Sequence, residues 1–291
     1  MHPRVNEVIA AFQSGDYARV ESLIRQILAT EPSIIDSGLR VSFGNGLVHT
    51  AAWDLVDALI PRDTNTLTTS GWLRSLLAGR PVNRDGEPIP WFAYAAIDFL
   101  EPRIRPEWRV FEWGAGFSTL WWAKRVASVH SVDTSPEWYA ELGRMAPPNV
   151  TLQLHREEAS YVDSVLAAGA PFDVVVIDGD WRNGCARRVA EAVKPDGLII
   201  FDNSDGDHFD EGVAHLMDTG WMRIDFVGLI PSYLYKNCTS VLFKDPSFLT
   251  RAPLPSKVAL CTGPTCFQSI ARINAANAAL AAAREAGEKP S

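Results

Sequence analysis

The residues best suited to chemistry lie in the run Glu112-Trp-Gly-Ala-Gly116. A strand is expected over 109–112, then a glycine turn, then a helix over about 118–126. Glycines leave space for a ligand beside the free backbone N–H groups of a helix N-terminus. A second expected strand, 128–132, is followed by Asp133, 19 positions after Gly114, where a carboxylate can bind both hydroxyls of a ribose. The spacing predicts a nucleoside cofactor site formed by Glu112, Gly114, Ala115, Gly116, Ser118, Asp133 and Thr134.

The residues around the glycines distinguish two kinds of cofactor. A nicotinamide site has a third glycine where this chain has Thr119, so that fingerprint is incomplete. Glu112 instead gives the pattern E-x-G-x-G, in which a carboxylate would repel a pyrophosphate but suits an ammonium group and a sulfonium. This pattern resembles the first motif of the class I S-adenosylmethionine-dependent methyltransferases. The alternatives are a nicotinamide-dependent oxidoreductase and a non-catalytic binding protein with the methyltransferase fold.

Acidic residues also follow the third and fourth expected strands, at 150–155 and 173–177. The resemblance implies that Glu157 or Glu158 contacts the adenine amino group of the cofactor. Both are equally suited to the first turn of a helix, where the helix dipole favours acids. Asp178 ends a buried apolar run, and an isolated carboxylate is too costly to bury there. Asp178 is therefore expected to be paired, bound to the ligand, or exposed in a cleft.

A fifth expected strand, 197–201, is followed by Asp202 and Asn203. Together with Asp178 they would present three oxygen donors at one cleft, as Mg²⁺ or another divalent cation requires. This set resembles the metal site of the cation-dependent O-methyltransferases, in which the metal lowers the pKa of a substrate hydroxyl. The resemblance implies a small-molecule oxygen acceptor, with nitrogen as the alternative. The competing interpretation is an ordinary turn at the strand end.

Proton transfer during methylation requires a base near the acceptor. The candidates are Asp178 and His208, with His155 less favoured because it lies farther from the expected cleft. An apolar substrate pocket also needs walls, and the aromatic candidates for them are Trp91, Trp181, Tyr233 and Tyr235.

The elements that must position these residues alternate along the chain. Two further strands are expected at 221–226 and 239–243, with helices at 135–145, 157–167 and 183–193 between the earlier strands. Five parallel strands and a final strand pair predict an α/β fold: a doubly wound, mostly parallel seven-stranded sheet. The resemblance implies the Rossmann-like methyltransferase fold, placed here at residues 89–246, beginning with a helix over 91–100.

Residues 1–62 are expected to form a helical accessory region, with a hairpin in the first thirty residues and a third helix at 47–60. Gly15, Asp16, Tyr17 and Pro32 look like half of a tetratricopeptide repeat, too little for a stack. The apolar residues of the hairpin are expected against the main domain or across a homodimer interface (Val5, Ile9, Phe12, Ile24 and Ile27). Residues 63–88 are expected as a linker or covering loop, and 247–291 as a loop and a helix at about 267–287.

Composition limits the partners. The 291 residues carry a net charge of −8 and no long basic run, which argues against a nucleic acid or an anionic membrane as partner. The four cysteines are too few for a disulfide scaffold, and Cys261 and Cys266 lack partners at zinc spacing. We therefore expect a cytoplasmic, reduced protein that acts on a small molecule.

Overall fold

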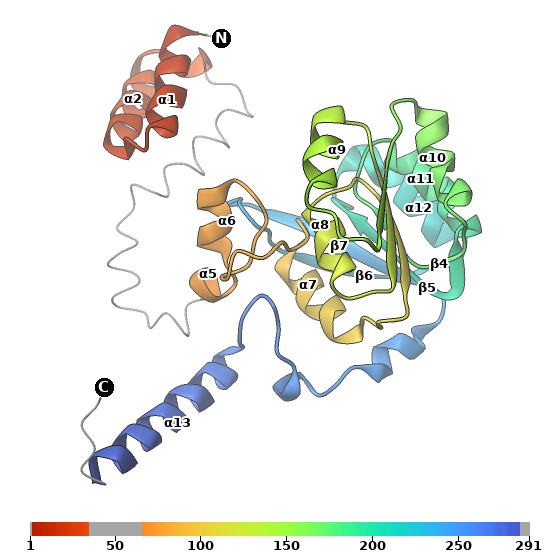
Figure 1. Ribbon diagram of the computed structural model, residues 1–291. Coiled ribbons are helices and arrows are strands. Elements are labelled where there is room, and N and C mark those ends of the chain that lie inside the picture. Colours follow the sequence, from red (N-terminus) through yellow and green to blue (C-terminus); the bar gives the residue numbers. More distant parts are fainter. Residues whose placement is uncertain (1, 35–65, 286–291) are drawn as a thin grey trace.

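The computed structural model describes residues 2–34 and 66–285 (Figure 1). Its centre is a seven-stranded sheet in the order β3-β2-β1-β4-β5-β7-β6. The strands are β1 (Arg109–Trp113), β2 (Ser128–Asp133), β3 (Val150–Leu154), β4 (Phe172–Ile177), β5 (Val193–Asp202), β6 (Met222–Leu229) and β7 (Lys236–Phe243). Strands β1 to β5 pair in parallel, and β7 runs antiparallel to both of its neighbours. The predicted fold class is confirmed.

Alternation along the strands produces a hydrophobic core on each face of the sheet. Val110, Val174 and Val176 belong to one core, whereas Phe111 and Val175 belong to the other. The first core also takes residues from α7 (Tyr94–Leu100) and α8 (Phe117–Ala123), and the second from α10 (Glu158–Ala167), α11 (Arg182–Arg188) and α12 (Asp210–Asp218). Helix α9 (Pro136–Gly143) packs through Leu142 on a smaller cluster near the glycine turn. Burial on both faces explains why β1 and β4 read as nearly continuous apolar runs.

Helix α12 was not among the helices predicted from the sequence. The helix follows Asp205, Asp207 and other polar residues, and its inner face comprises few side chains, including Val213 and Leu216. The apolar repeat of this helix is too short to be recognised in the sequence after such a polar stretch.

The segment expected as a linker or covering loop contains α5 (Thr66–Thr69) and α6 (Trp72–Ala78). Trp72 is buried, and its indole Nε1 donates to the backbone carbonyl of Tyr233 at 2.9 Å. Ser232 Oγ donates to the carbonyl of Ser75 at 3.0 Å. These bonds attach α6 to the loop between β6 and β7, about 160 residues away in sequence.

The N-terminal hairpin consists of α1 (Pro3–Gln13) and α2 (Tyr17–Thr30). Asp16 caps α2 by accepting a hydrogen bond from the backbone of Arg19 at 3.1 Å. The apolar faces of the two helices pack on each other in a cluster of their own. The third helix expected at 47–60 lies outside the described residues.

The C-terminal segment contacts α7 and the turn after it before reaching α13 (Cys266–Glu285). The backbone N–H of Cys261 donates to Glu101 at 2.6 Å, and the Thr262 hydroxyl donates to Asp98. Among the described helices, none combines the length and the apolar character needed to cross a bilayer.

Candidate functional site

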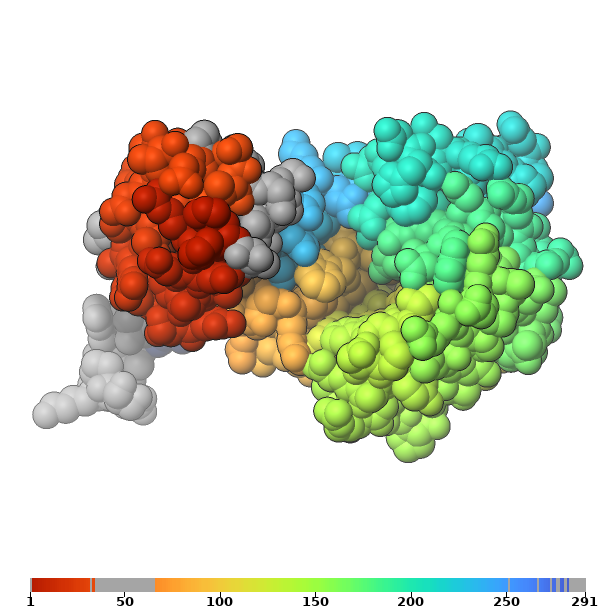
Figure 2. Space-filling view, turned by 90° about the horizontal axis from the view of Figure 1, so that it is seen from above, coloured from red at the N-terminus to blue at the C-terminus, as the bar shows by residue number. Residues whose placement is uncertain are grey.

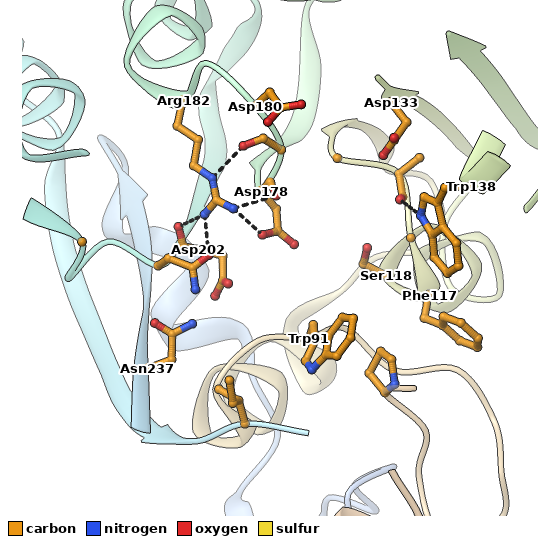
Figure 3. A pocket seen from close by; sticks show the side chains of 18 of the residues that line it. Trp91, Phe117, Ser118, Asp133, Trp138, Asp178, Asp180, Arg182, Asp202 and Asn237 are labelled. Atoms are coloured by element: carbon orange, nitrogen blue, oxygen red, sulfur yellow. Dashed lines mark hydrogen bonds and ion pairs between the residues drawn. The ribbon is translucent and has the colours of Figure 1, made fainter. Parts of the chain in front are cut away.

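A cavity of about 680 Å³ opens where β1, β2, β4 and β5 end (Figure 3). The chain continues from β1 to β2 on one side of the sheet and from β4 to β5 on the other side. Open α/β sheets bind ligands at the point where the connections diverge in this way. The glycine turn and the ends of β2, β4 and β5 line the cavity from the sheet. Pro81, Trp91 and the loop between β6 and β7 complete its wall. The space-filling view from above shows a hollow between the parts of the main domain (Figure 2).

The turn after β1 requires glycine at its first position. Gly114 has φ +95°, and a Cβ there would lie 2.7 Å from the backbone carbonyl carbon of Asp178. The N–H groups of Gly114 and Ala115 both donate to the carbonyl of Val132, at 2.9 and 3.0 Å. The turn is thus held against both β2 and β4, and Gly116 and Ser118 line the cavity as predicted contacts.

Glu112 lies beneath this turn and does not line the cavity, although the sequence predicted that it would face the cofactor. Its side chain is fully buried, and Oε2 accepts from the Thr119 hydroxyl and from Ser131 Oγ at 2.9 Å. Thr119 Oγ1 in turn accepts from the N–H of Gly116 at 2.9 Å. The residue that breaks the nicotinamide fingerprint therefore links the glycine turn to a buried carboxylate.

Burial raises the pKa of Glu112 to about 7, despite the hydrogen bonds from side chains such as Thr119 and Ser131 that lower it. Its second oxygen, Oε1, has no hydrogen-bond partner within the part of the chain that the structure describes. The carboxyl group is therefore a positioning group that supports the turn from below.

Asp133 lies at the end of β2, lines the cavity and is half-buried. Its Oδ1 accepts from the backbone N–H of Ser135 at 2.8 Å. Burial raises the pKa of Asp133, and hydrogen bonds from the backbone partly oppose that effect. Phe117 and Trp138 lie nearby with ring centroids 6.0 Å apart. A carboxylate beside aromatic rings can bind a ribose and the base attached to it.

Asp178, Asp202 and Asn203 come together as predicted, but Arg182 lies among them. Its Nη1 donates to Asn203 Oδ1 at 2.8 Å and also to the backbone carbonyl of Asp202. Its Nη2 donates to the carbonyl of Asp178 at 2.8 Å and to Oδ1 of the same residue at 3.2 Å. A fifth bond runs from Nε to the carbonyl of Gly179 at 2.9 Å. One buried guanidinium thus joins the ends of β4 and β5.

The predicted metal set does not fit a divalent cation, because one side-chain oxygen of each of the three residues already has a partner. Arg182 binds Asp178 Oδ1 and Asn203 Oδ1, and the Thr239 hydroxyl donates to Asp202 Oδ1. Within residues 2–34 and 66–285, no group of three or more His, Cys, Asp or Glu side chains is arranged to hold a metal. A divalent cation needs six or more oxygen ligands and would have to displace the guanidinium.

The two aspartates of this cluster have raised pKa values. Burial raises the pKa of Asp178 to about 6, with Arg182 lowering it and Asp133 raising it. Burial and then the Asp178 carboxylate raise the pKa of Asp202 well above its ordinary value. Asp178 faces the cavity with 19% of its side chain exposed, so it can exchange protons with a bound molecule.

Several predicted site residues lie outside the cavity. His208 lies in a short 3-10 helix at Asp207–Phe209, where its side chain is 69% exposed and its ring contacts Phe209. His155 lies near Gln153, and Trp181 packs on Tyr161. Glu157 and Glu158 are exposed at the start of α10 and do not reach the cavity.

The sequence analysis missed other residues that line the cavity. Asp180, Arg182, Asp205, Lys236 and Asn237 are among them. Thr134, a predicted contact, donates to Asp180 Oδ2 at 2.7 Å. The run Asp178-Gly-Asp-Trp-Arg182 contained the signal for one of them, Arg182, because an acid and a cation four positions apart can pair.

Comparison with protein families finds no match for this chain, and comparison with curated proteins finds none either. Among solved structures, the chain is similar to precorrin-6Y C5,15-methyltransferase from Geobacter metallireducens, at 16% identity over 52% of this chain and 87% of that one, with a TM-score of 0.43. It is also similar to spermidine synthase from Thermotoga maritima, at 15% identity over 56% and 60%, with a TM-score of 0.43. Precorrin-8W decarboxylase from Methanobacterium thermoautotrophicum is 20% identical over 51% and 86%, with a TM-score of 0.38. These similarities extend over about half of the chain and concern its fold alone, so its function has to be inferred from the cavity itself.

Proposed function

We propose that this protein transfers a methyl group from S-adenosylmethionine to a small molecule bound in the cavity. The observation that carries the proposal is the acidic character of the cavity beside the glycine turn. Five aspartates line it together with two cationic side chains, a formal surplus of acids over cations of three (Asp133, Asp178, Asp180, Asp202, Asp205; Arg182, Lys236). S-adenosylmethionine carries a sulfonium and an ammonium group, so it suits such a cavity.

The same charges disfavour a nicotinamide cofactor. A pyrophosphate bound at the glycine turn needs positive potential from a helix N-terminus and no carboxylates nearby. Here the carboxylates of Asp178 and Asp180 lie across the turn. An oxidoreductase would therefore have to hold two phosphates against several carboxylates.

The residues at the turn can hold the methyl donor. The Gly114–Gly116 turn leaves a surface free of side chains, Asp133 can accept from the ribose hydroxyls, and Phe117 and Trp138 offer an apolar face to the adenine. When bound, the donor would supply a methyl group activated by its sulfonium. The chain would orient this group toward the acceptor side of the cavity and limit the access of water.

Asp178 is the residue best placed to accept a proton from the acceptor. It lines the cavity between the glycine turn, the end of β5 and the start of β7, and the Arg182 guanidinium beside it favours its ionised form. Arg182 fixes the carboxylate by a hydrogen bond of 3.2 Å. We infer that Asp178 is the general base and Arg182 a positioning residue.

The sequence favoured an oxygen acceptor because a metal would acidify a hydroxyl. The arginine among the strand ends removes that reason, so no part of the proposed mechanism uses a metal. A carboxylate with a pKa of about 6 is too weak a base to ionise an ordinary aliphatic hydroxyl by itself.

Titration calorimetry with S-adenosylhomocysteine and with NAD tests the proposal. We expect the first to bind and the second not to bind. Asp133→Ala should weaken S-adenosylhomocysteine binding by about tenfold or more, since charge-assisted hydrogen bonds to the ribose are lost. Glu137→Ala, one helical turn away and exposed, is the control and should bind normally. Binding of NAD alone would show that the assignment is wrong.

A non-catalytic binding protein is the remaining alternative. It predicts S-adenosylhomocysteine binding that is unaffected by Asp178→Asn, with no methyl transfer to any acceptor. Turnover that falls at least a hundredfold in Asp178→Asn, with donor affinity retained, would exclude this alternative.

A further inference from the structure

We infer that the methyl acceptor is a protonated amine carried on a small apolar group, and that nitrogen receives the methyl group. This inference rests on the proposed function, since it concerns the other half of the same cavity. Figure 3 shows Asp133 and Trp138 at one end of the open space and Asp202 and Asn237 at the other, with Asp178 and Trp91 between them.

Charge is the first argument for an amine. Even with a proton on Asp202, the other four aspartates exceed Arg182 and Lys236 by two negative charges. The methyl donor carries a single net positive charge, so part of this surplus remains when the donor is bound. Arg182 is already engaged by five hydrogen bonds, and Lys236 is exposed at the rim. A cationic acceptor would neutralise this remaining charge, whereas an anionic one would be repelled.

Asp202 marks the place where a bound cation could replace the proton that burial favours on this acid. Its side chain is only 2% exposed yet belongs to the cavity wall, and within the described chain its side-chain oxygen Oδ1 has the Thr239 hydroxyl as its partner. The guanidinium of Arg182 contacts the backbone of Asp202 and not its carboxylate. A buried acid next to Asp178 is costly unless a proton or a cation compensates it.

An aromatic wall is the second, independent argument. The rings of Trp91 and Tyr233 stack with centroids 5.7 Å apart, and Tyr233 and Tyr235 lie 4.8 Å apart, so the three rings form a continuous surface. The indole Nε1 of Trp91 donates to the carbonyl of Pro231 at 2.7 Å, which fixes the first ring. Aromatic faces attract an ammonium group and also cover an apolar body.

The proposed reaction balances with one proton and one methyl group. The ammonium group of the acceptor gives a proton to the Asp178 carboxylate, and the freed nitrogen pair forms the new N–C bond. At the same time the C–S bond of the donor breaks, with its electron pair going to sulfur. The products are a methylated ammonium ion and S-adenosylhomocysteine, and Asp178 releases its proton to solvent.

A pair of probes of equal shape tests the inference. Protein saturated with S-adenosylhomocysteine is titrated with phenethylamine and with its neutral analogue 2-phenylethanol. We expect the amine to bind at least tenfold more tightly, and we expect this preference to shrink when sodium chloride is raised from about 50 to 500 mM. With S-adenosylmethionine, the amine should yield an N-methylated product that mass spectrometry detects.

Three variants locate the effect. Asp202→Asn and Asp205→Asn should each weaken amine binding at least fivefold and leave binding of the alcohol unchanged. Asp205 is exposed at the rim, so it serves as the second variant if Asp202→Asn fails to fold. Asp207→Asn is the control, because this acid is two residues farther on and its side chain is 99% exposed outside the cavity.

The outcomes separate the two proposals. If the natural protein does not bind S-adenosylhomocysteine, the proposed function is contradicted. Normal S-adenosylhomocysteine binding, combined with equal affinity for the amine and the alcohol or with no binding of the amine, would overturn the inference of an amine acceptor alone.

Discussion

Glu112 is a carboxyl group buried without a cation, and this makes the stability of the fold depend on pH. Burial raises its pKa from 4.5 to about 7. Between these two values the folded chain holds a proton that the unfolded chain has released. Stability therefore falls as the pH rises through this window and is level above it.

Glu112→Gln tests this at the scale of one residue. The amide is neutral at all pH values, so the variant should gain stability relative to the natural protein by up to about 1.4 kcal/mol per pH unit between pH 5 and 7. Urea unfolding at several pH values measures the difference. Glu137→Gln, which is exposed, should show no such trend. A constant difference across the window would mean that Glu112 is not neutral when folded.

Arg182 is the second residue whose contribution can be isolated. Arg182→Lys keeps the charge but cannot reproduce five hydrogen bonds to the ends of β4 and β5. We expect a loss of about 2–4 kcal/mol of unfolding free energy. Arg187→Lys, on the same helix but paired with exposed Glu211, should cost less than about 0.5 kcal/mol. Dialysis against EDTA should not alter either result; destabilisation by the chelator would restore the metal hypothesis.

At the scale of elements, the acceptor wall depends on how α6 packs against residues 82–88, the segment that follows it. Gly71, which precedes α6, has φ +83°, and a Cβ there would lie 2.2 Å from the carbonyl carbon of Asn83. Gly79, at the other end of the same helix, has φ +60° with open space around it. Gly71 is thus required both by its positive φ and by the lack of space for a Cβ, whereas Gly79 is required by its positive φ alone.

Gly71→Ala should therefore destabilise the protein by about 3 kcal/mol or more, and Gly79→Ala by only about 1 kcal/mol. The first variant should also loosen the contact between Trp72 and Tyr233, and so weaken phenethylamine binding more than S-adenosylhomocysteine binding. Thermal unfolding and calorimetry measure the two effects. Equal losses in both variants would show that Asn83 can move aside at little cost.

The sequence predicted elements best where the signal is local. The apolar runs that became β1 and β4 end in acids or glycines, so their boundaries and the glycine turn could be located directly. Arg182 could not be assigned its role, because its partners Asp202 and Asn203 meet it only through the pairing of β4 with β5. His208 was favoured for lying after a strand end, but position along the chain does not determine the direction of a side chain in a loop.

At the scale of the whole molecule, the N-terminal hairpin has a hydrophobic cluster of its own. Val8 and Ile27 are buried within the hairpin itself, so a partner is not needed to cover them. A single repeat-like helix pair nevertheless normally stacks on a neighbouring pair. Leu28 offers an exposed apolar side chain for such a contact, with 48% of the residue accessible.

We expect the full chain to be a homodimer in light scattering, and a chain beginning at Thr64 to be a monomer that still binds S-adenosylhomocysteine. Leu28→Glu should give the same monomer, because a buried charge would oppose the contact. Leu77→Glu, at an exposed position of α6, should leave the dimer intact. If the shortened chain still has twice the mass of its monomer in light scattering, the hairpin does not mediate assembly.

The bond between Trp72 and Tyr233 joins residues 161 positions apart, and that between Trp91 and Pro231 joins residues 140 positions apart. The glycine turn, Asp133 and Trp138 lie within a short stretch of the chain by comparison. Contacts between distant residues have the higher loop-closure cost and form late. During synthesis from the N-terminus, the donor half would thus be assembled well before the acceptor wall, whose partners emerge only with the β6–β7 loop. A nascent chain would bind the donor before it could select an acceptor.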